Sequence, residues 1–163
     1  MPGQWAEIFN PYLHAKGNTL CFDDPNGSTS DGTQAQLYRC HGYASNGAPQ
    51  RWVFVPIVDS NDIPFLDNGS QVYWVYNLAA NECLIDANTT PGTQLTLGTC
   101  TSLGTGWELH SANGPNSPDF QLALYNPGRQ NCAAASNFTD RNGTRLVIED
   151  CVPSDTRQLW NRG

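Results

Sequence analysis

One pattern of residues occurs three times in this chain of 163 residues, and it limits the possible folds more than any other feature. Each copy has a first Cys, a Gly-Thr pair that starts eight residues before a second Cys, and a Trp within twelve residues after that Cys. The copies span residues 21–52, 83–107 and 132–160, and the steps from Trp to Trp are 55 and 53 residues. Repetition at this period predicts that one supersecondary unit is used three times.

Each copy brings two cysteines, so the simplest prediction is one disulfide within each copy. The expected pairs are Cys21–Cys40, Cys83–Cys100 and Cys132–Cys151. Each bond would stabilise the fold by about 3 kcal/mol. Six reduced cysteines in a cytosolic protein are the alternative. Zinc is disfavoured, because the chain contains no Cys-x-x-Cys spacing.

Disulfides form in oxidising compartments, which predicts a secreted, extracellular protein. The first five residues, Met-Pro-Gly-Gln-Trp, contain neither the charged region nor the apolar region of a signal peptide. We therefore expect that a signal peptide has been removed. A cytoplasmic protein made without a signal is the alternative.

Alternation of apolar and polar residues, rich in aromatic and β-branched side chains, predicts short strands. Every copy should contain four. The first ends in Asn (5–10, 73–77, 122–126) and the second surrounds the first Cys. The third follows Gly-Thr (35–39, 95–99, 146–150), and the fourth carries the Trp (51–55, 107–110, 159–161). Segments 56–70 and 111–118 are rich in Asp, Asn, Gly, Pro and Ser, which predicts surface loops.

Three four-stranded units can close on each other around a pseudo-threefold axis, which removes the sheet edges that open sheets would expose. We therefore expect an all-β fold with one domain over residues 1–163, in lobes of about 1–60, 61–112 and 113–163. Trp52, Trp107 and Trp160 should lie in its shared core. A three-bladed propeller is the competing closure, but propellers usually have at least four blades.

Charge and motif content argue against several functions. The net charge is −7, and the eight basic residues are scattered, which disfavours nucleic acid as a partner. No segment reaches the roughly 18 apolar residues of a membrane helix, so we expect no membrane insertion. The three His are isolated and no hydrolase motif occurs, so we expect no enzyme activity, no metal and no cofactor.

The combination of Cys-x-Asp, Gly-Thr-x-x-x-Leu-aromatic-x-Cys and Gln-x-Trp resembles the ricin B-type lectin family. The resemblance covers the chain from its first strand to Trp160. It implies a β-trefoil of three four-stranded lobes, each with one potential sugar pocket. It also implies a carbohydrate-binding lectin or module. The family's usual ligands are galactose-type sugars, N-acetylgalactosamine and, in modules linked to hydrolases, xylan.

By the same resemblance, a sugar pocket combines a carboxylate, an aromatic platform and amide side chains. An aromatic ring packs against the C–H face of a sugar. A carboxylate accepts from adjacent hydroxyls, and a carboxamide both donates and accepts. In the first lobe these positions hold Asp23, Gln36, Tyr38, Asn46 and Gln50. Asn46 replaces the amide that the family often has at position 49, which is Pro here. We also expect Gln50 to satisfy backbone groups.

The other two lobes lack this set of residues. The second lobe has Ile85 in place of the carboxylate and Gly98 in place of the platform. The third has Ala134, Val147 and Glu149 at the corresponding positions. We therefore expect one working pocket, in the first lobe. The sequence does not predict the oligomeric state.

Two other functions stay open at this point. A β-trefoil protease inhibitor would present a surface loop to a peptidase, and Ile63-Pro64-Phe65-Leu66 within segment 56–70 could form such a loop. The chain could also be a targeting module of a larger glycoside hydrolase or toxin, with the same binding chemistry.

Overall fold

The computed structural model describes residues 4–42, 48–101, 105–125, 130–138 and 141–163. Its strands fall into three groups of four. The first lobe contains β1 (Ile8–Ala15), β2 (Asn18–Asp23), β3 (Gln36–Arg39) and β4 (Trp52–Pro56). The second contains β7 (Tyr73–Asn77), β8 (Glu82–Ile85), β9 (Thr96–Gly98) and β10 (Trp107–Ser111). The third contains β11 (Phe120–Leu124), β12 (Asn131–Ala135), β13 (Thr144–Asp150) and β14 (Asn161–Arg162).

The shorter elements lie between these strands. A small hairpin of β5 (Leu66–Asp67) and β6 (Ser70–Gln71) lies where the sequence predicted only a loop. The 3₁₀ turns that lie fully within the described residues are η1 (Pro25–Gly27), η2 (Ala48–Gln50) and η4 (Thr156–Gln158). The twelve strands of the three lobes agree with the prediction of four per lobe.

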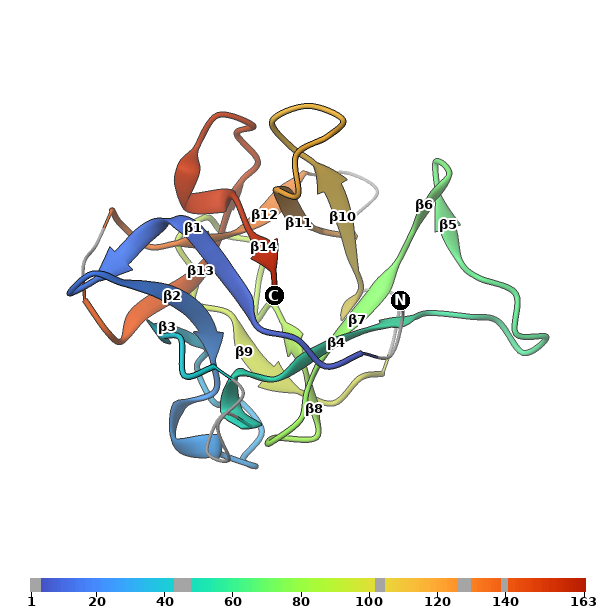
Figure 1. The fold of residues 1–163 in the computed structure, drawn as a ribbon. Coiled ribbons are helices and arrows are strands. Elements are labelled where there is room, and N and C mark those ends of the chain that lie inside the picture. The colour runs from blue at the N-terminus through green and yellow to red at the C-terminus, as the bar shows by residue number, and fades with distance from the viewer. Residues whose placement is uncertain (1–3, 43–47, 102–104, 126–129, 139–140) are drawn as a thin grey trace.

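The first and fourth strands of the lobes form a closed barrel (Figure 1). Strand β4 pairs with β7, β10 with β11, and β14 with β1, so the last strand of each lobe joins the first strand of the next. Within each lobe, one antiparallel β-bridge to the repeated Trp joins the first strand to the fourth and completes the barrel. These bridges are Ala6–Trp52, Tyr73–Trp107 and Phe120–Trp160.

The hairpins β2–β3, β8–β9 and β12–β13 cap the barrel and meet in a cycle of backbone hydrogen bonds. Ala35 N donates to Leu95 O at 2.9 Å, Leu95 N to Leu146 O at 2.9 Å, and Leu146 N to Ala35 O at 3.3 Å. Each lobe gives one donor and accepts one bond. This is the pseudo-threefold closure that the repeat predicted.

The glycine of each Gly-Thr pair lies in the turn before the third strand of its lobe, which enters this cap. Gly32, Gly92 and Gly143 have φ values of +80°, +87° and +83°, a region that glycine enters without steric cost. Their N–H groups donate across lobes to Leu97 O, Ile148 O and Leu37 O at 2.7–2.8 Å. The repeated glycine is therefore explained by a turn that also joins neighbouring lobes.

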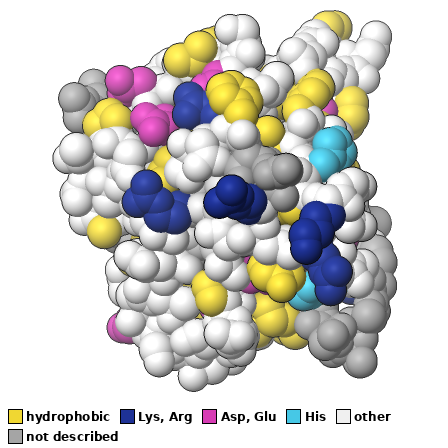
Figure 2. Space-filling view, turned by 90° about the vertical axis from the view of Figure 1, so that its left-hand side faces the viewer, with side chains coloured by type: hydrophobic (Ala, Val, Ile, Leu, Met, Phe, Trp, Pro, Cys, Tyr) yellow, Lys and Arg dark blue, Asp and Glu magenta, His cyan; other side chains and the backbone are white. Residues whose placement is uncertain are grey.

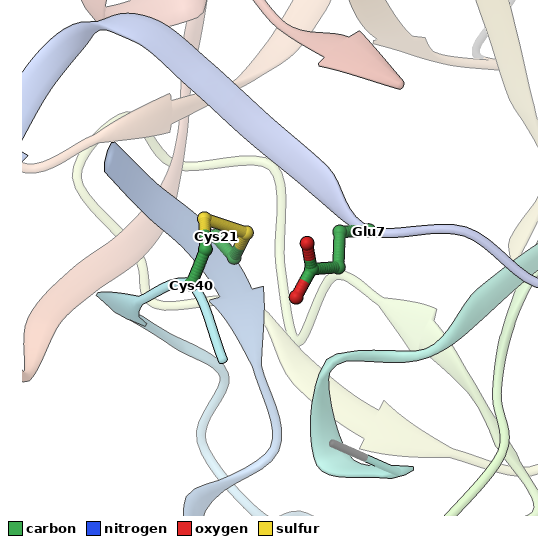
Figure 3. A group of neighbouring side chains, drawn as sticks. All are labelled: Glu7, Cys21 and Cys40. Atoms are coloured by element: carbon green, nitrogen blue, oxygen red, sulfur yellow. A yellow bond between two sulfur atoms is a disulfide. The ribbon is translucent and has the colours of Figure 1, made fainter. Parts of the chain in front are cut away.

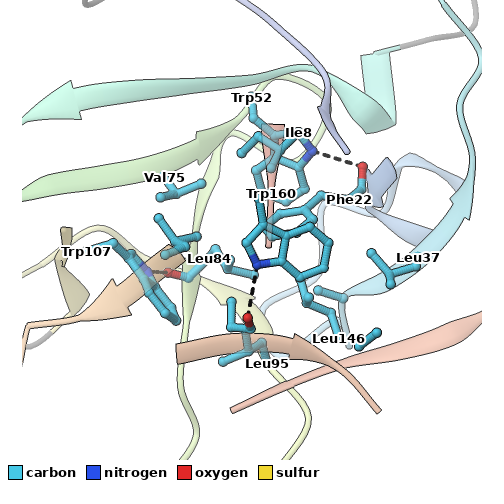
Figure 4. Close-up of a cluster of buried hydrophobic side chains, with 14 of the residues drawn as sticks. Ile8, Phe22, Leu37, Trp52, Val75, Leu84, Leu95, Trp107, Leu146 and Trp160 are labelled. Atoms are coloured by element: carbon cyan, nitrogen blue, oxygen red, sulfur yellow. Dashed lines mark hydrogen bonds between the residues drawn. The ribbon is translucent and has the colours of Figure 1, made fainter. Parts of the chain in front are cut away.

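The three repeated tryptophans form the centre of the core, as predicted (Figure 4). Each indole Nε1 donates to the carbonyl of the residue after the first Cys of its own lobe, Phe22, Leu84 or Ala133, at 2.8–3.0 Å. The Phe22 ring also lies edge-on to Trp160, with 4.6 Å between ring centroids. Each Trp side chain thus fills the barrel, and its only polar atom, Nε1, has a hydrogen-bond acceptor.

The cysteines form one disulfide in each lobe, with the pairing that the repeat predicted. The bonds are Cys21–Cys40, Cys83–Cys100 and Cys132–Cys151. All-β strands, three pseudo-symmetric lobes, a closed barrel and a hairpin cap together make this fold a β-trefoil.

Residues 57–72, which we call the arm, project from the barrel between β4 and β7 (Figure 1). Gln71 Nε2 holds the base of the arm by donating to the carbonyls of Ile57, Phe65 and Val72 at 3.3, 3.1 and 2.7 Å. Ile63 and Leu66 are more than half exposed, at 58% and 54%. The arm is therefore hydrogen-bonded internally and apolar at its surface.

The described residues include no helix of the length and apolar character needed to cross a membrane.

Candidate functional site

The first-lobe carboxylate, Asp23, lies at the end of β2 and is almost buried, with 5% of its surface exposed. Its Oδ2 accepts a hydrogen bond from Gln36 Nε2 at 2.7 Å, and its Oδ1 accepts one from Gln50 Nε2 at 3.1 Å. Asp23 and Gln36 are opposite each other in the β2–β3 register, which explains their contact. The structure thus brings three of the predicted site residues together.

Gln50 has a second role, which the sequence also predicted. Its Oε1 accepts from His41 N at 2.8 Å, and its Nε2 donates to Arg39 O at 3.1 Å. Gln158 makes the same two bonds around Cys151, with Val152 N and Asp150 O. The glutamine of Gln-x-Trp therefore holds the chain on both sides of the second Cys, and in the first lobe it also holds Asp23.

Burial raises the pKa of Asp23, and the hydrogen bonds from Gln36 and Gln50 partly offset this effect, as does nearby His41. The two amides stabilise the charged form of Asp23. Because each amide bonds one carboxylate oxygen, they also fix the orientation of the carboxylate.

The predicted platform, Tyr38, is half-buried on β3, while its neighbour Leu37 points into the core. The Tyr38 ring lies edge-on to the His41 ring, with 5.5 Å between centroids and 64° between planes. His41 was not predicted as a site residue. Its only sequence signal was its place directly after Cys40. Asn46 lies outside the described residues.

In the second lobe the pocket position is filled from within. Ile85 is opposite Thr96 in the register, as Asp23 is opposite Gln36 in the first lobe. A Cβ at Gly98 would lie 2.5 Å from Ile85 Cδ1, so this isoleucine occupies the space that a platform side chain would need. The third lobe pairs Ala134 with Val147, both fully buried.

The next residue, Asp24, is fully buried and directed elsewhere. Its Oδ1 accepts from Ser28 N at 3.2 Å. Its Oδ2 is buried without a hydrogen-bond partner among the described residues. Burial, reinforced by the nearby carboxylates of Asp23 and Glu82, raises the pKa of Asp24 to about 7.

One group of three potential metal ligands occurs in the part of the chain that the structure describes, namely Glu7, Cys21 and Cys40. Figure 3 shows the Glu7 carboxylate pointing toward the two sulfur atoms, which are bonded to each other. Glu7 Oε1 accepts from Gly42 N at 2.8 Å. Since the disulfide consumes both thiols, this group offers no thiolate to a metal.

Figure 2 shows several Lys and Arg side chains spaced across one face of the molecule, among uncharged side chains.

A scan of the sequence against models of protein families finds no match, and a search among curated protein sequences finds none either. Solved structures do match. A designed threefold-symmetric protein, ThreeFoil, matches with a TM-score of 0.71 and 17% identity, over 97% of this chain and 96% of that chain. The ricin B-like lectin of Macrolepiota procera, in complex with lactose, matches with a TM-score of 0.66 and 18% identity, over 99% and 96%.

An exo-beta-1,3-galactanase from Clostridium thermocellum also matches, with a TM-score of 0.72 and 12% identity. The match covers 98% of this chain and 30% of the galactanase chain. At such low identities the likeness concerns the fold. The resemblance that the Gln-x-Trp repeat predicted is thereby confirmed for the fold, and the protein has the β-trefoil fold of the ricin B-type lectins.

Proposed function

We propose that this protein binds carbohydrate through one pocket in its first lobe, formed by Asp23, Gln36 and Tyr38, with Gln50 behind them. The observation that carries the proposal is the Asp23 carboxylate, whose two oxygens are each held by one side-chain amide beside a half-exposed tyrosine. A carboxylate offers about four acceptor positions, and these amides use two. The remaining positions can accept two neighbouring sugar hydroxyls.

A galactose-type sugar, including N-acetylgalactosamine, fits this chemistry best. Its axial O4 leaves one continuous C–H face, which can pack on the Tyr38 ring, while O3 and O4 reach the carboxylate. The lactose complex of the Macrolepiota procera lectin supports this choice, because lactose ends in galactose. Xylan is the alternative. A shallow pocket of this kind typically binds with a Kd of about 0.1–1 mM, or roughly −4 to −5.5 kcal/mol.

We further propose one domain over residues 1–163 that works by binding rather than catalysis. Of the three lobe pockets that the resemblance implies, only the first should bind sugar. Ile85 fills the second, and the apolar side chains of Ala134 and Val147 stand at the third. The three disulfides favour a secreted, extracellular protein. The match to one part of a galactanase supports the alternative of a targeting module in a larger glycoside hydrolase or toxin.

A glycan array followed by calorimetry with lactose tests the proposal. Tyr38→Ala removes the platform and should weaken binding at least about tenfold, which corresponds to about 1.4 kcal/mol. Tyr76→Ala is the matched control, because Tyr76 is also half-buried but lies on β7 against Trp5. Equal binding by wild type and Tyr38→Ala would contradict the site. Absence of binding to every glycan would contradict the function.

The arm favours a protease inhibitor as the second candidate. Asp59 Oδ1 accepts from Asn61 N and Ile63 N, so the loop before Ile63-Pro64-Phe65-Leu66 is preorganised. An apolar pocket of about 220 Å³ lies here, lined by Ile57, Val58, Asp59, Ile63, Pro64 and Phe65. Inhibition of a cysteine, serine or aspartic peptidase that Ile63→Asp abolishes would establish this function. Inhibition by neither protein would exclude it for these classes.

A further inference from the structure

We propose a second carbohydrate site where the third lobe meets the first, formed by Tyr12, Asn113 and Asp119, with Asn161 behind them. The inference takes its ligand class from the proposed function, but it does not depend on the first-lobe pocket. The four residues come from β1, the loop between β10 and β11, and β14. They contain the same chemical parts as the first-lobe pocket, an aromatic ring, a buried carboxylate and two amides.

The aromatic ring is both exposed and fixed in place. Tyr12 has 45% of its surface exposed, yet its hydroxyl donates to Asp119 Oδ2 at 2.7 Å. Asn113 Nδ2 donates to the Tyr12 hydroxyl at 3.1 Å. A ring held in this way loses little freedom when a sugar packs on it, which lowers the entropic cost of binding.

The carboxylate is oriented by three neighbours. Asp119 is 7% exposed, and besides the tyrosine it accepts from Asn113 Nδ2 at 2.8 Å and from Asn161 Nδ2 at 3.2 Å. Burial opposes the ionisation of Asp119, but these hydrogen bonds, together with one from Ser117, outweigh it and hold the pKa below its ordinary value. The group is therefore a charged acceptor near neutral pH.

Two acceptor atoms remain at this junction. Asp119 Oδ1 has one partner, Asn161. Asn113 is exposed, and none of the described residues donates to its Oδ1. Two neighbouring hydroxyls of a hexose can bond to these atoms while its C–H face lies on Tyr12. Asp119 accepts from Tyr12, Asn113 and Asn161, and Ser117 also hydrogen-bonds it. Little acceptor capacity is therefore left on the carboxylate, and we expect weaker binding than at Asp23.

The fold does not require this cluster, because the equivalent junction between the first and second lobes lacks it. The side-chain oxygen of Asn10 accepts from the backbone N–H of Tyr12, and that of Asn77 accepts from the N–H of Ala79. Tyr12 in the first lobe and Ala79 in the second lobe therefore occupy equivalent positions. The strand bridges Phe120–Trp160 and Ala6–Trp52 align Asp119 with Trp5, and Asn161 with Val53. An alanine and a tryptophan thus stand where the junction of the third and first lobes has a tyrosine and an aspartate.

A second site would change what one molecule can do. A single weak pocket can hold one glycan end, whereas two pockets on one rigid body can bridge two chains of a branched glycan or two glycoproteins, and so gain avidity.

The test is a titration of the folded, disulfide-bonded protein with lactose, N-acetylgalactosamine and xylobiose, followed by NMR. The side-chain amide signals of Asn113 and Asn161 report on the second site, and those of Gln36 report on the first. We expect one of these sugars to shift both sets. Tyr12→Ala should raise the Kd at Asn113 at least about tenfold and leave the Kd at Gln36 within about twofold.

Tyr12→Phe separates binding from a structural role. It loses the hydroxyl that bonds Asp119 but keeps the ring, so binding should persist at the second site. If Phe and Ala abolish it equally, Tyr12 only holds the junction and the proposal is wrong. Shifts at Gln36 alone would also overturn it while keeping the proposed function, whereas no shift at either site with any sugar would overturn both.

Discussion

Asp23 and Asp24 are neighbours in the sequence, but they meet different surroundings because they leave the chain in different directions. Asp23 meets two amides that support its charge, whereas one oxygen of Asp24 finds no hydrogen-bond partner among the described residues. Burial, together with the nearby carboxylates of Asp23 and Glu82, raises the pKa of Asp24 to about 7. At the scale of single residues, a carboxylate next to the pocket lowers stability near neutral pH.

Asp24→Asn should remove this loss. Folded Asp24 keeps its proton between its ordinary pKa of 3.8 and about 7, whereas the unfolded chain has released it. Its contribution to stability is therefore fully present below pH 3.8 and is lost as the pH rises to about 7. At pH 8 the variant should unfold with a free energy about 1–2 kcal/mol higher than wild type. Urea unfolding at pH 8 and pH 3.5 measures the difference, which should vanish at the lower pH.

The second-lobe position can be given a pocket by two substitutions. Gly98 does not have a positive φ, so its backbone accepts a side chain once Ile85 is shortened. Ile85→Asp with Gly98→Tyr restores the carboxylate and the platform and should add a second lactose-binding event with a Kd of about 1–10 mM. Gly98→Tyr alone should not, because Ile85 fills the space. Calorimetry with unchanged stoichiometry in the double variant would contradict the filled-pocket interpretation.

At the scale of elements, the cap and the arm differ in how far the sequence could predict them. The twelve strands followed from local alternation, and Gly32, Gly92 and Gly143 marked where the cap begins. The β5–β6 hairpin was not predicted, because the Asp, Asn, Gly, Pro and Ser content of segment 56–70 indicated a loop. Its local signal was the pair Asn68-Gly69, whose φ values of +48° and +86° suit a tight hairpin turn.

The same distinction applies to the two sites. Asp23, Gln36, Tyr38 and Gln50 were predicted because each stands at a fixed distance from a Cys or a Trp. Tyr12 and Asp119 are 107 residues apart, and no local spacing relates them. Contacts between lobes depend on closure of the barrel, which the sequence specifies only as a whole.

Gln71→Ala should loosen the arm and leave the barrel intact. The Nε2 group of Gln71 shares its two protons among three carbonyls, each of which also accepts from a backbone N–H. Its loss should therefore remove hydrogen bonds that contribute about 1 kcal/mol each. Amide hydrogen exchange within residues 57–72 should become about tenfold faster, with little change in β1 or β14. Gln34→Ala, at an exposed position, is the control. Uniform acceleration throughout the molecule would show instead that the arm is part of the cooperative core.

At the scale of the whole molecule, the pseudo-threefold arrangement makes the lobes comparable. The disulfides close stretches of 19, 17 and 19 residues at matching positions, and each Trp satisfies its Nε1 in the same way. The lobes share their frame and differ in the side chains placed on it, which is why one lobe can hold a pocket while another fills the same position.

Replacing both cysteines of one lobe with serine should lower the free energy of unfolding by about 3 kcal/mol. Because the three loops are so similar, the three losses should agree within about 1 kcal/mol. Guanidinium unfolding of the three double variants measures this. A much larger loss in one lobe would show that its disulfide also supports contacts with a neighbouring lobe.

The cycle of hydrogen bonds through Ala35, Leu95 and Leu146 also sets an order of events during synthesis. A ribosome adds roughly 5–20 residues per second, so Ala35 is made several seconds before Leu146. The Ala35 carbonyl accepts its hydrogen bond from the Leu146 N–H, and this donor is therefore missing until late in synthesis. Until then the strand edge of the first lobe has no native partner to pair with. Newly made chains therefore pass through a period in which this edge can pair with other chains, and chaperones that shield it should raise the yield of folded protein.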